Sequence, residues 1–110
     1  MINDNDIKEE GTYAIQNSPI LKNLSHLDLS HNTLGETGAQ MLSITTNLTQ
    51  LKFLNLNYNN IGENGCKCIA DSDSFPLLQD LIIYTGNGIN AKAKAYILRS
   101  PKLRSLNHVS

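Results

Sequence analysis

The chain has 110 residues, of which 40% are hydrophobic and 17% are charged, and its formal net charge is −1 at pH 7. This length suits one domain, and the balanced charge argues against a nucleic-acid-binding protein, which would carry an excess of lysine and arginine. No stretch is apolar over the length needed to cross a bilayer, and the opening MINDNDIKEEG is too polar for a secretory signal peptide. The sequence therefore predicts a soluble protein of the cytoplasm.

A unit of 27 residues repeats along the chain. Leu24 to Gly38 spell L-x-x-L-x-L-x-x-N-x-L-G-x-x-G, and Leu51 to Gly65 spell the same pattern with Ile61 in place of a leucine. A fixed period of roughly 20 to 50 residues indicates a solenoid, in which each repeat is one supersecondary unit. We expect a single domain over residues 1–110: a partial repeat in 1–23, repeats in 24–50, 51–77 and 78–102, and a terminal strand in 103–110. The third repeat fits only if one residue is inserted within the stretch from Tyr84 to Gly86.

Each repeat is predicted to contain a strand followed by a helix. From Leu27 to Ser30 leucines alternate with polar residues, which directs the leucines to one face of a strand. Helices are expected over residues 7–17, 37–46, 64–72 and 91–100, and strands joined by such crossovers run parallel. The predicted fold class is α/β: a short right-handed solenoid with a parallel sheet on its concave side and helices on its convex side.

Four recurring polar and small residues are given structural roles. Asn32 and Asn59 stand where the chain turns off the strand, where their amides can satisfy backbone groups that neither helix nor sheet would pair. Gly38 and Gly65 fall at the start of each predicted helix, where a missing side chain would let the helix lie close to the sheet.

The repeated string resembles the leucine-rich repeat of the ribonuclease-inhibitor type, which is long and has a helix in its second half. Ala93 departs from the helix glycine of that pattern, and Asn87 is displaced by one residue. The resemblance implies a horseshoe fold that binds proteins through its concave face, and it raises the expectation that binding inhibits a partner enzyme. A short chain rich in Asn, Ile and Lys also resembles repeat proteins of intracellular bacteria, which are delivered into a host cytoplasm or restrain other effectors.

Residues that alternate with the inward leucines are expected on the concave face. Phe53, Tyr58, Ile82 and Tyr84 would form its apolar centre, although the chain has only six aromatic residues. An apolar centre with a polar rim is typical of a protein interface, whereas single exposed apolar residues are ordinary and form the alternative interpretation. The predicted rows are His26, Phe53, Asp80 and Ser105; Asp28, Asn55, Ile82 and Asn107; Ser30, Asn57 and Tyr84; and His31 and Tyr58, with Lys52 and Arg104 at the rim.

Two other functions compete with protein recognition. His26, Asp28 and Ser30 emerge on one face and are the residue types of a nucleophilic triad, but Asp28 stands between the other two along the strand and no oxyanion donor is evident. We therefore expect no catalytic residue, no metal site and no cofactor. The second alternative is a structural or self-assembling array. His108 is predicted at an inward position opposite Leu29 and Leu56, which suits an edge covered by a partner or a second copy.

Overall fold

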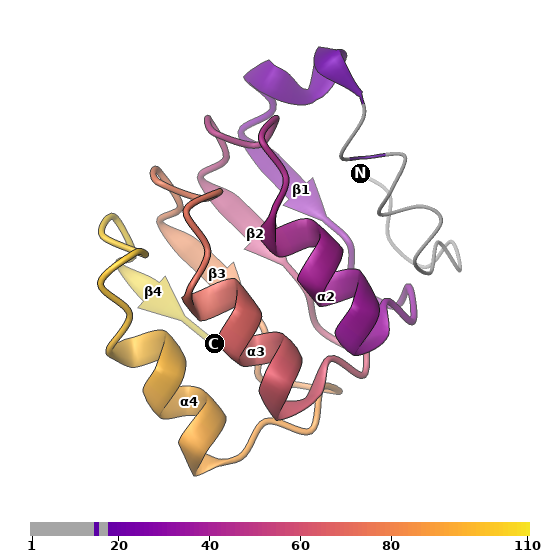
Figure 1. Ribbon diagram of the computed structural model, residues 1–110, viewed down its shortest axis with the longest axis vertical. Coiled ribbons are helices and arrows are strands. Elements are labelled where there is room, and N and C mark those ends of the chain that lie inside the picture. Colours follow the sequence, from indigo (N-terminus) through magenta and orange to yellow (C-terminus); the bar gives the residue numbers. More distant parts are fainter. Residues whose placement is uncertain (1–14, 16–17) are drawn as a thin grey trace.

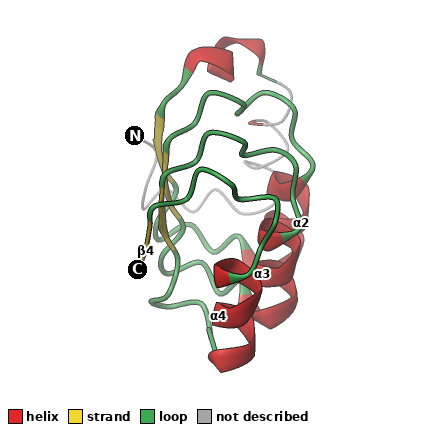
Figure 2. Ribbon diagram, turned by 90° about the vertical axis from the view of Figure 1, so that its left-hand side faces the viewer, coloured by secondary structure: helices red, strands yellow, loops and turns green. Residues whose placement is uncertain are grey.

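The computed structural model describes residue 15 and residues 18–110 (Figure 1). One sheet of four parallel strands follows the order of the chain, as the alternation of leucines predicts. Its strands are β1 (His26–Asp28), β2 (Phe53–Asn55), β3 (Asp80–Ile82) and β4 (His108–Val109). Helices α2 (Gly35–Ser43), α3 (Gly62–Ala70) and α4 (Ala91–Leu98) form a second layer, and the short 3-10 helix η1 (Pro19–Asn23) precedes β1. Figure 2 shows the two layers edge-on, with strands on one side and helices on the other. The predicted α/β solenoid class is confirmed.

The helices are shorter than the sequence predicts. Helices α2 and α3 begin two residues earlier than expected, and all three end two or three residues sooner. Serines follow α3 and α4 and bond to the backbone of the preceding repeat: Ser72 Oγ donates to the carbonyl of Ser43, and Ser100 Oγ donates to that of Ala70. Such side chains compete with helical backbone bonds, which explains the early ends of α3 and α4. The helix predicted over residues 7–17 lies outside the described residues apart from Ile15.

The core lies between the two layers and is built from the recurring apolar positions. Leu27, Leu54 and Leu81 of the three longer strands are at most 3% exposed, and the residues two positions later are completely buried. Fully burying one such side chain contributes about 1.5 to 3 kcal/mol. Small residues fill the positions between the helices, where Ala39, Cys66 and Ala93 are all fully buried. The period-two pattern of each strand therefore determines which face of the sheet the helices cover.

Asparagines form a hydrogen-bonded ladder at the turns that follow the strands. Asn59 Oδ1 accepts from the backbone N–H groups of Asn32 and Leu34, at 3.0 and 3.3 Å, and its Nδ2 donates to the carbonyls of Leu29 and Leu56, at 2.9 and 3.0 Å. Asn87 repeats this arrangement, because its Oδ1 accepts from the N–H groups of Asn59 and Ile61. Each of these side chains therefore connects one repeat to the one before it.

Gly38 and Gly65 lie deeper in their helices than predicted, and they do not serve the approach to the sheet. Each is the fourth residue of its helix and is buried. A Cβ atom on Gly38 would lie 2.7 Å from the Cβ of Leu34, and one on Gly65 would lie 2.5 Å from Ile61 Cγ2 and 3.1 Å from the Cβ of Ala39 in α2. The missing side chain thus makes room for the preceding turn and, at Gly65, for the neighbouring helix.

Replacing Asn59 with alanine should destabilise the fold strongly. The change leaves two buried N–H groups and three carbonyls without this partner. Buried unsatisfied groups cost about 1 to 3 kcal/mol each, so we expect a loss of about 3 kcal/mol or more. Urea unfolding followed by circular dichroism measures it. The exposed Asn64 on α3 provides the control, because Asn64→Ala should change stability by less than about 0.5 kcal/mol. Similar losses for the two variants would contradict the ladder's role.

Candidate functional site

The face of the sheet that points away from the helices carries the residues that alternate with the core leucines. Strand pairing aligns His26 with Phe53, Phe53 with Asp80, and Asp80 with His108. The next row contains Asp28, Asn55 and Ile82. We call these seven residues the outer sheet face. Most of the residues that the sequence analysis proposed for partner binding lie on it or at its edge.

The fourth strand stands three residues later in the sequence than predicted. His108 pairs with Asp80 and Val109 with Leu81, so His108 points outward and Val109 inward, and the predicted inward position of His108 is wrong. The placement of Ser105 beside Asp80 and of Asn107 beside Ile82 is wrong for the same reason. The turn before the strand shows the same shift. The N–H of Leu106 donates to the carbonyl of Leu103, and the N–H of Leu78 donates to the carbonyl of Phe75, so Leu106 and not Leu103 corresponds to Leu78.

Arg104 consequently lies in the loop before β4 and does not belong to the rim of the Asp80 row. Its Nε donates to the carbonyl of Pro101 at 3.2 Å, within the same loop. Its place as a partner-binding residue beside Asp80 is therefore not supported by the register.

Tyr84 is the inserted residue of the third repeat, and the insertion removes it from the outer sheet face. The N–H of Leu56 donates to the carbonyl of Ile82, and the N–H of Tyr58 donates to that of Thr85. Two residues of the second repeat thus span the same distance as three residues of the third, which has one extra residue there. The Tyr84 ring packs against the core, with Lys94 Nζ of α4 at 4.9 Å from its centroid, and burial raises the pKa of its hydroxyl. Its predicted place in the apolar centre is wrong.

Two stacked ring pairs hold exposed side chains in place. His26 stacks on Phe53 with a centroid distance of 5.6 Å, and His31 stacks on Tyr58 at 4.3 Å. Tyr58 is 48% exposed although it is a large aromatic residue. A Cβ atom on Gly86 would lie 2.5 Å from Tyr58 Cδ1, so the ring approaches the backbone of the next repeat where there is no side chain. These pairs present apolar ring surface beside the polar rows.

The polar residues of this region bond mainly to the chain around them. Asp28 Oδ1 accepts from both the N–H and the hydroxyl of Ser30, at 2.9 and 2.6 Å, and Ser30 is only 5% exposed. Asn55 Oδ1 accepts from the N–H of Asn57, whose own Oδ1 accepts from the N–H of Thr85. These side chains shape the backbone at the ends of the strands.

His26, Asp28 and Ser30 are not arranged as a catalytic relay. The hydroxyl of Ser30 donates to Asp28, whereas Nδ1 of His26 lies 3.0 Å from Ser25 Oγ. A relay needs a histidine nitrogen hydrogen-bonded to the nucleophile's hydroxyl.

In the part of the chain that the structure describes, no three His, Cys, Asp or Glu side chains converge as a metal site would require. Within the same residues, no helix is long and apolar enough to span a membrane.

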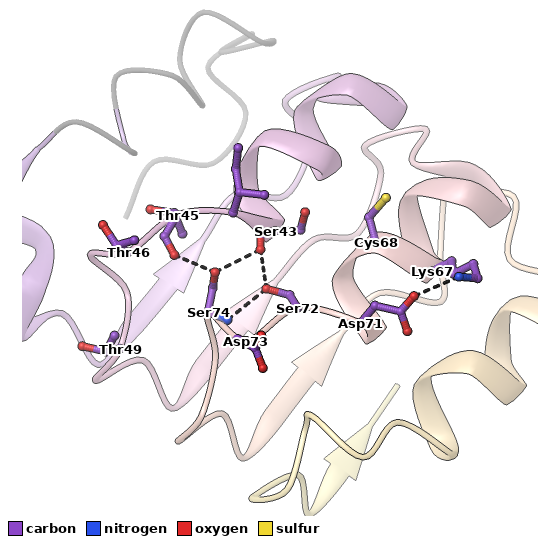
Figure 3. A pocket seen from close by; sticks show the side chains of 11 residues that line it. Ser43, Thr45, Thr46, Thr49, Lys67, Cys68, Asp71, Ser72, Asp73 and Ser74 are labelled. Atoms are coloured by element: carbon purple, nitrogen blue, oxygen red, sulfur yellow. Dashed lines mark hydrogen bonds and ion pairs between the residues drawn. The ribbon is translucent and has the colours of Figure 1, made fainter.

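An open hollow of about 620 Å³ lies on the helical side, and the sequence analysis missed it (Figure 3). It is lined by the hydroxyl-rich segments after α2 and α3, with Cys68 and the 71% exposed Ile44. Its polar groups mostly bond to one another or to nearby backbone, as in the Ser74 hydroxyl on the Thr45 carbonyl at 2.6 Å. The serines and threonines after α2 and α3 are the sequence feature that could have indicated the hollow. The same residues also form the hydrogen bonds of the turns, so their presence alone does not indicate a binding site.

Alanine substitutions should separate the two aromatic residues that the sequence analysis grouped together. Tyr84→Ala should lower the free energy of unfolding by about 2 kcal/mol, less than the 3 to 5 kcal/mol of a fully buried aromatic residue, because the ring is partly exposed. Phe53→Ala, on the outer sheet face, should cost less than about 1 kcal/mol. Urea denaturation of both variants measures the difference, and a larger loss for Phe53→Ala would overturn the placement.

The two cysteines should differ in reactivity. Burial raises the pKa of Cys66 to about 11, whereas Cys68 lines the open hollow. Iodoacetamide at pH 8 should therefore label one cysteine in the native protein and both in urea, as counted by mass spectrometry. Because the folded state holds the Cys66 proton more tightly, this thiol's contribution to stability is complete below its ordinary pKa and is lost as pH rises toward 11. Double labelling of the native protein would contradict this assignment.

Comparison with known proteins agrees with the geometry. A family model described as Leucine Rich repeat matches residues 21–43 and 47–70. No curated protein matches the chain. The matched segments contain β1 with α2 and β2 with α3, and the parallel pairing continues the same unit through β3 and β4. The chain thus contains two segments that match leucine-rich repeats, and it folds as a short α/β solenoid.

Proposed function

We propose that this protein is a non-enzymatic recognition module that binds another protein through its outer sheet face, with Phe53 at the centre of the contact. Leucine-rich repeats are generally protein-binding modules. The observation that carries the proposal is the apolar and aromatic surface of Phe53 and Ile82 on a face that no helix of the described chain covers. Tyr58, stacked on His31, extends this surface toward the turns.

The polar surroundings of Phe53 support the same function. Asp80 and His108 lie on one side of it, His26 lies on the other, and Lys52 is exposed at the start of β2. Interfaces typically combine a few aromatic anchors with a polar rim, and the anchors supply most of the binding free energy. Four parallel strands hold these groups at fixed spacings, so little conformational entropy is lost when a partner binds.

The finer part of the proposal is that binding regulates a partner enzyme, by covering its active site. The resemblance of the two central repeats to the ribonuclease-inhibitor type supports it. A rigid face can block a substrate's access without supplying any catalytic group. The partner would be met in a cytoplasm, that of the producing cell or that of a host cell into which the protein is delivered as an effector or a regulator of effectors.

Phe53→Ala should weaken partner binding by about 2 kcal/mol while the fold stays intact. The partner is first captured on immobilised wild-type protein from lysates of the source organism and of a candidate host, and its affinity is then measured by calorimetry. Leu98→Ala is the matched control. Leu98 is 68% exposed on α4, so its substitution removes apolar surface away from the outer sheet face. It should change affinity by less than about 0.5 kcal/mol.

A greater loss for Leu98→Ala than for Phe53→Ala would refute binding through the outer sheet face and would point to the α4 end of the molecule. If the captured partner is an enzyme, its activity with and without the repeat protein tests the regulatory part separately. Unchanged activity at saturating concentration would leave a binding module that recruits or stabilises its partner.

A further inference from the structure

The strand register places the short side chain of Asp80 between the ring-bearing residues Phe53 and His108 on the outer sheet face, and we call the space above Asp80 the slot. The row His26, Phe53, Asp80 and His108 crosses the four strands, and neighbouring residues of such a row stand about 4.8 Å apart. Three of the four have ring side chains, and Asp80 is short. Its carboxylate therefore forms the floor between Phe53 on one side and His108 on the other.

Only one face of the Phe53 ring is covered within its row. His26 stacks on it at 5.6 Å with an interplanar angle of 19°. Since His26 lies on β1 and the stacking direction crosses the strands, the opposite ring face is turned toward β3 and Asp80. The backbones of Phe53 and His108 are separated by about 9.6 Å, two strand spacings. Stacked planar groups have centroids about 4.5 to 7 Å apart, so one further planar group fits in the slot.

The Asp80 carboxylate makes no hydrogen bond or ion pair with any residue that the structure describes. The ion pairs among those residues use other acids: Asp71 binds Lys67, Glu63 binds Lys92, and Asp73 binds Lys102. Asp28, the other carboxylate of the outer sheet face, is engaged with Ser30. Asp80 is partly exposed, and it is therefore the acceptor that this face offers to a cation from outside.

We propose that the slot receives an arginine side chain of the partner protein, with its guanidinium stacked on the free face of Phe53 and paired with the Asp80 carboxylate. This inference rests on the proposed function, since it names the chemistry that the same face recognises. A guanidinium is planar, is always charged, stacks on aromatic rings and donates two parallel hydrogen bonds to a carboxylate. Ile82, two residues beyond Asp80 on the same face, provides apolar contact for the methylene stem.

Arginine suits this slot better than lysine does. An ammonium group can pair with Asp80, but it is compact and strongly hydrated and does not provide a plane to stack on Phe53. An uncharged planar group can stack but gains no charge-assisted hydrogen bond. The combination of ring, carboxylate and apolar flank thus selects for both planarity and positive charge.

The test uses three blocked tripeptides, acetyl-Gly-X-Gly-amide, in which X is arginine, lysine or citrulline. Citrulline is the uncharged analogue of arginine and controls for stacking alone. Each peptide is titrated into nitrogen-15-labelled protein at low ionic strength, and amide chemical shifts are followed by NMR. The arginine peptide should shift the amides of Phe53, Asp80 and Ile82, with an affinity about tenfold above that of either control peptide.

Two variants with the same change of charge locate the effect. Asp80→Asn should lower the affinity for the arginine peptide by about tenfold or more, because the charge-assisted bonds are lost. Asp71→Asn, at the end of α3, should leave it unchanged. Thermal unfolding of both variants verifies the fold. The proposal is overturned by equal binding of the citrulline or lysine peptide, by retained binding in Asp80→Asn, by shifts confined to other residues, or by no shift with any peptide.

The result is independent of the test of the proposed function. A partner whose capture depends on Phe53 but not on Asp80 would retain the protein-binding function and refute the arginine slot. Binding of the arginine peptide at Asp80 with no partner captured through Phe53 would retain the slot and refute the wider function.

Discussion

Satisfying the backbone at the turn after each strand is the constraint on which the rest of the structure depends. There the chain leaves the sheet inside the core, so its N–H and carbonyl groups can reach neither water nor a regular partner. The amide of Asn59 has two acceptor and two donor sites, and it uses them on two successive repeats. An aspartate could accept but not donate, and a leucine could do neither. One residue type therefore satisfies the turns of successive repeats and joins them to each other.

The ladder also holds the backbone around it in an unusual conformation. His31, Tyr58 and Gly86 occupy one repeat position with φ near +60 to +74°, and Thr33, Asn60 and Gly88 occupy another with φ between +53 and +64°. Residues other than glycine pay about 1 to 2 kcal/mol for this conformation. The neighbouring asparagine bonds, together with backbone bonds such as Gly62 N–H to the Asn87 carbonyl at 2.8 Å, keep the chain there. The imidazole–tyrosine pair at the edge of the outer sheet face is a consequence of this geometry.

The fold could be predicted from the sequence wherever the spacing of the recurring residues allowed only one strand register. In the two central repeats three leucines, an asparagine and two glycines agree, and the strands lie where the pattern places them. At the end of the chain the pattern is ambiguous. Leucines three residues apart occur both at Leu21 and Leu24, before β1, and at Leu24 and Leu27, entering it. The pair Leu103 and Leu106 fits both, and only the inward Val109 decides for the later register.

The prediction of the candidate site failed at Tyr84 and around the fourth strand for a related reason. Alternation assigns a face by counting residues, so one inserted residue reverses every assignment until the pattern resumes. The displacement of Asn87 revealed that an insertion exists but not which residue is extra, and Tyr84 turned out to be that residue. The fourth strand is shifted by three residues, an odd number, so its faces are exchanged as well. His108, predicted to point inward, therefore points outward.

The corrected register makes the outer sheet face less apolar and more selective than a cluster of four large side chains would be. With Tyr84 packed against the core, Phe53 is left between an imidazole and a carboxylate, and His108 closes the row. Apolar area alone binds many partners weakly, whereas an unpaired charge next to a ring penalises every partner that lacks a matching group. The rigid ladder beneath the strands keeps these groups at fixed distances. Recognition by this face therefore depends on the same asparagines that hold the repeats together.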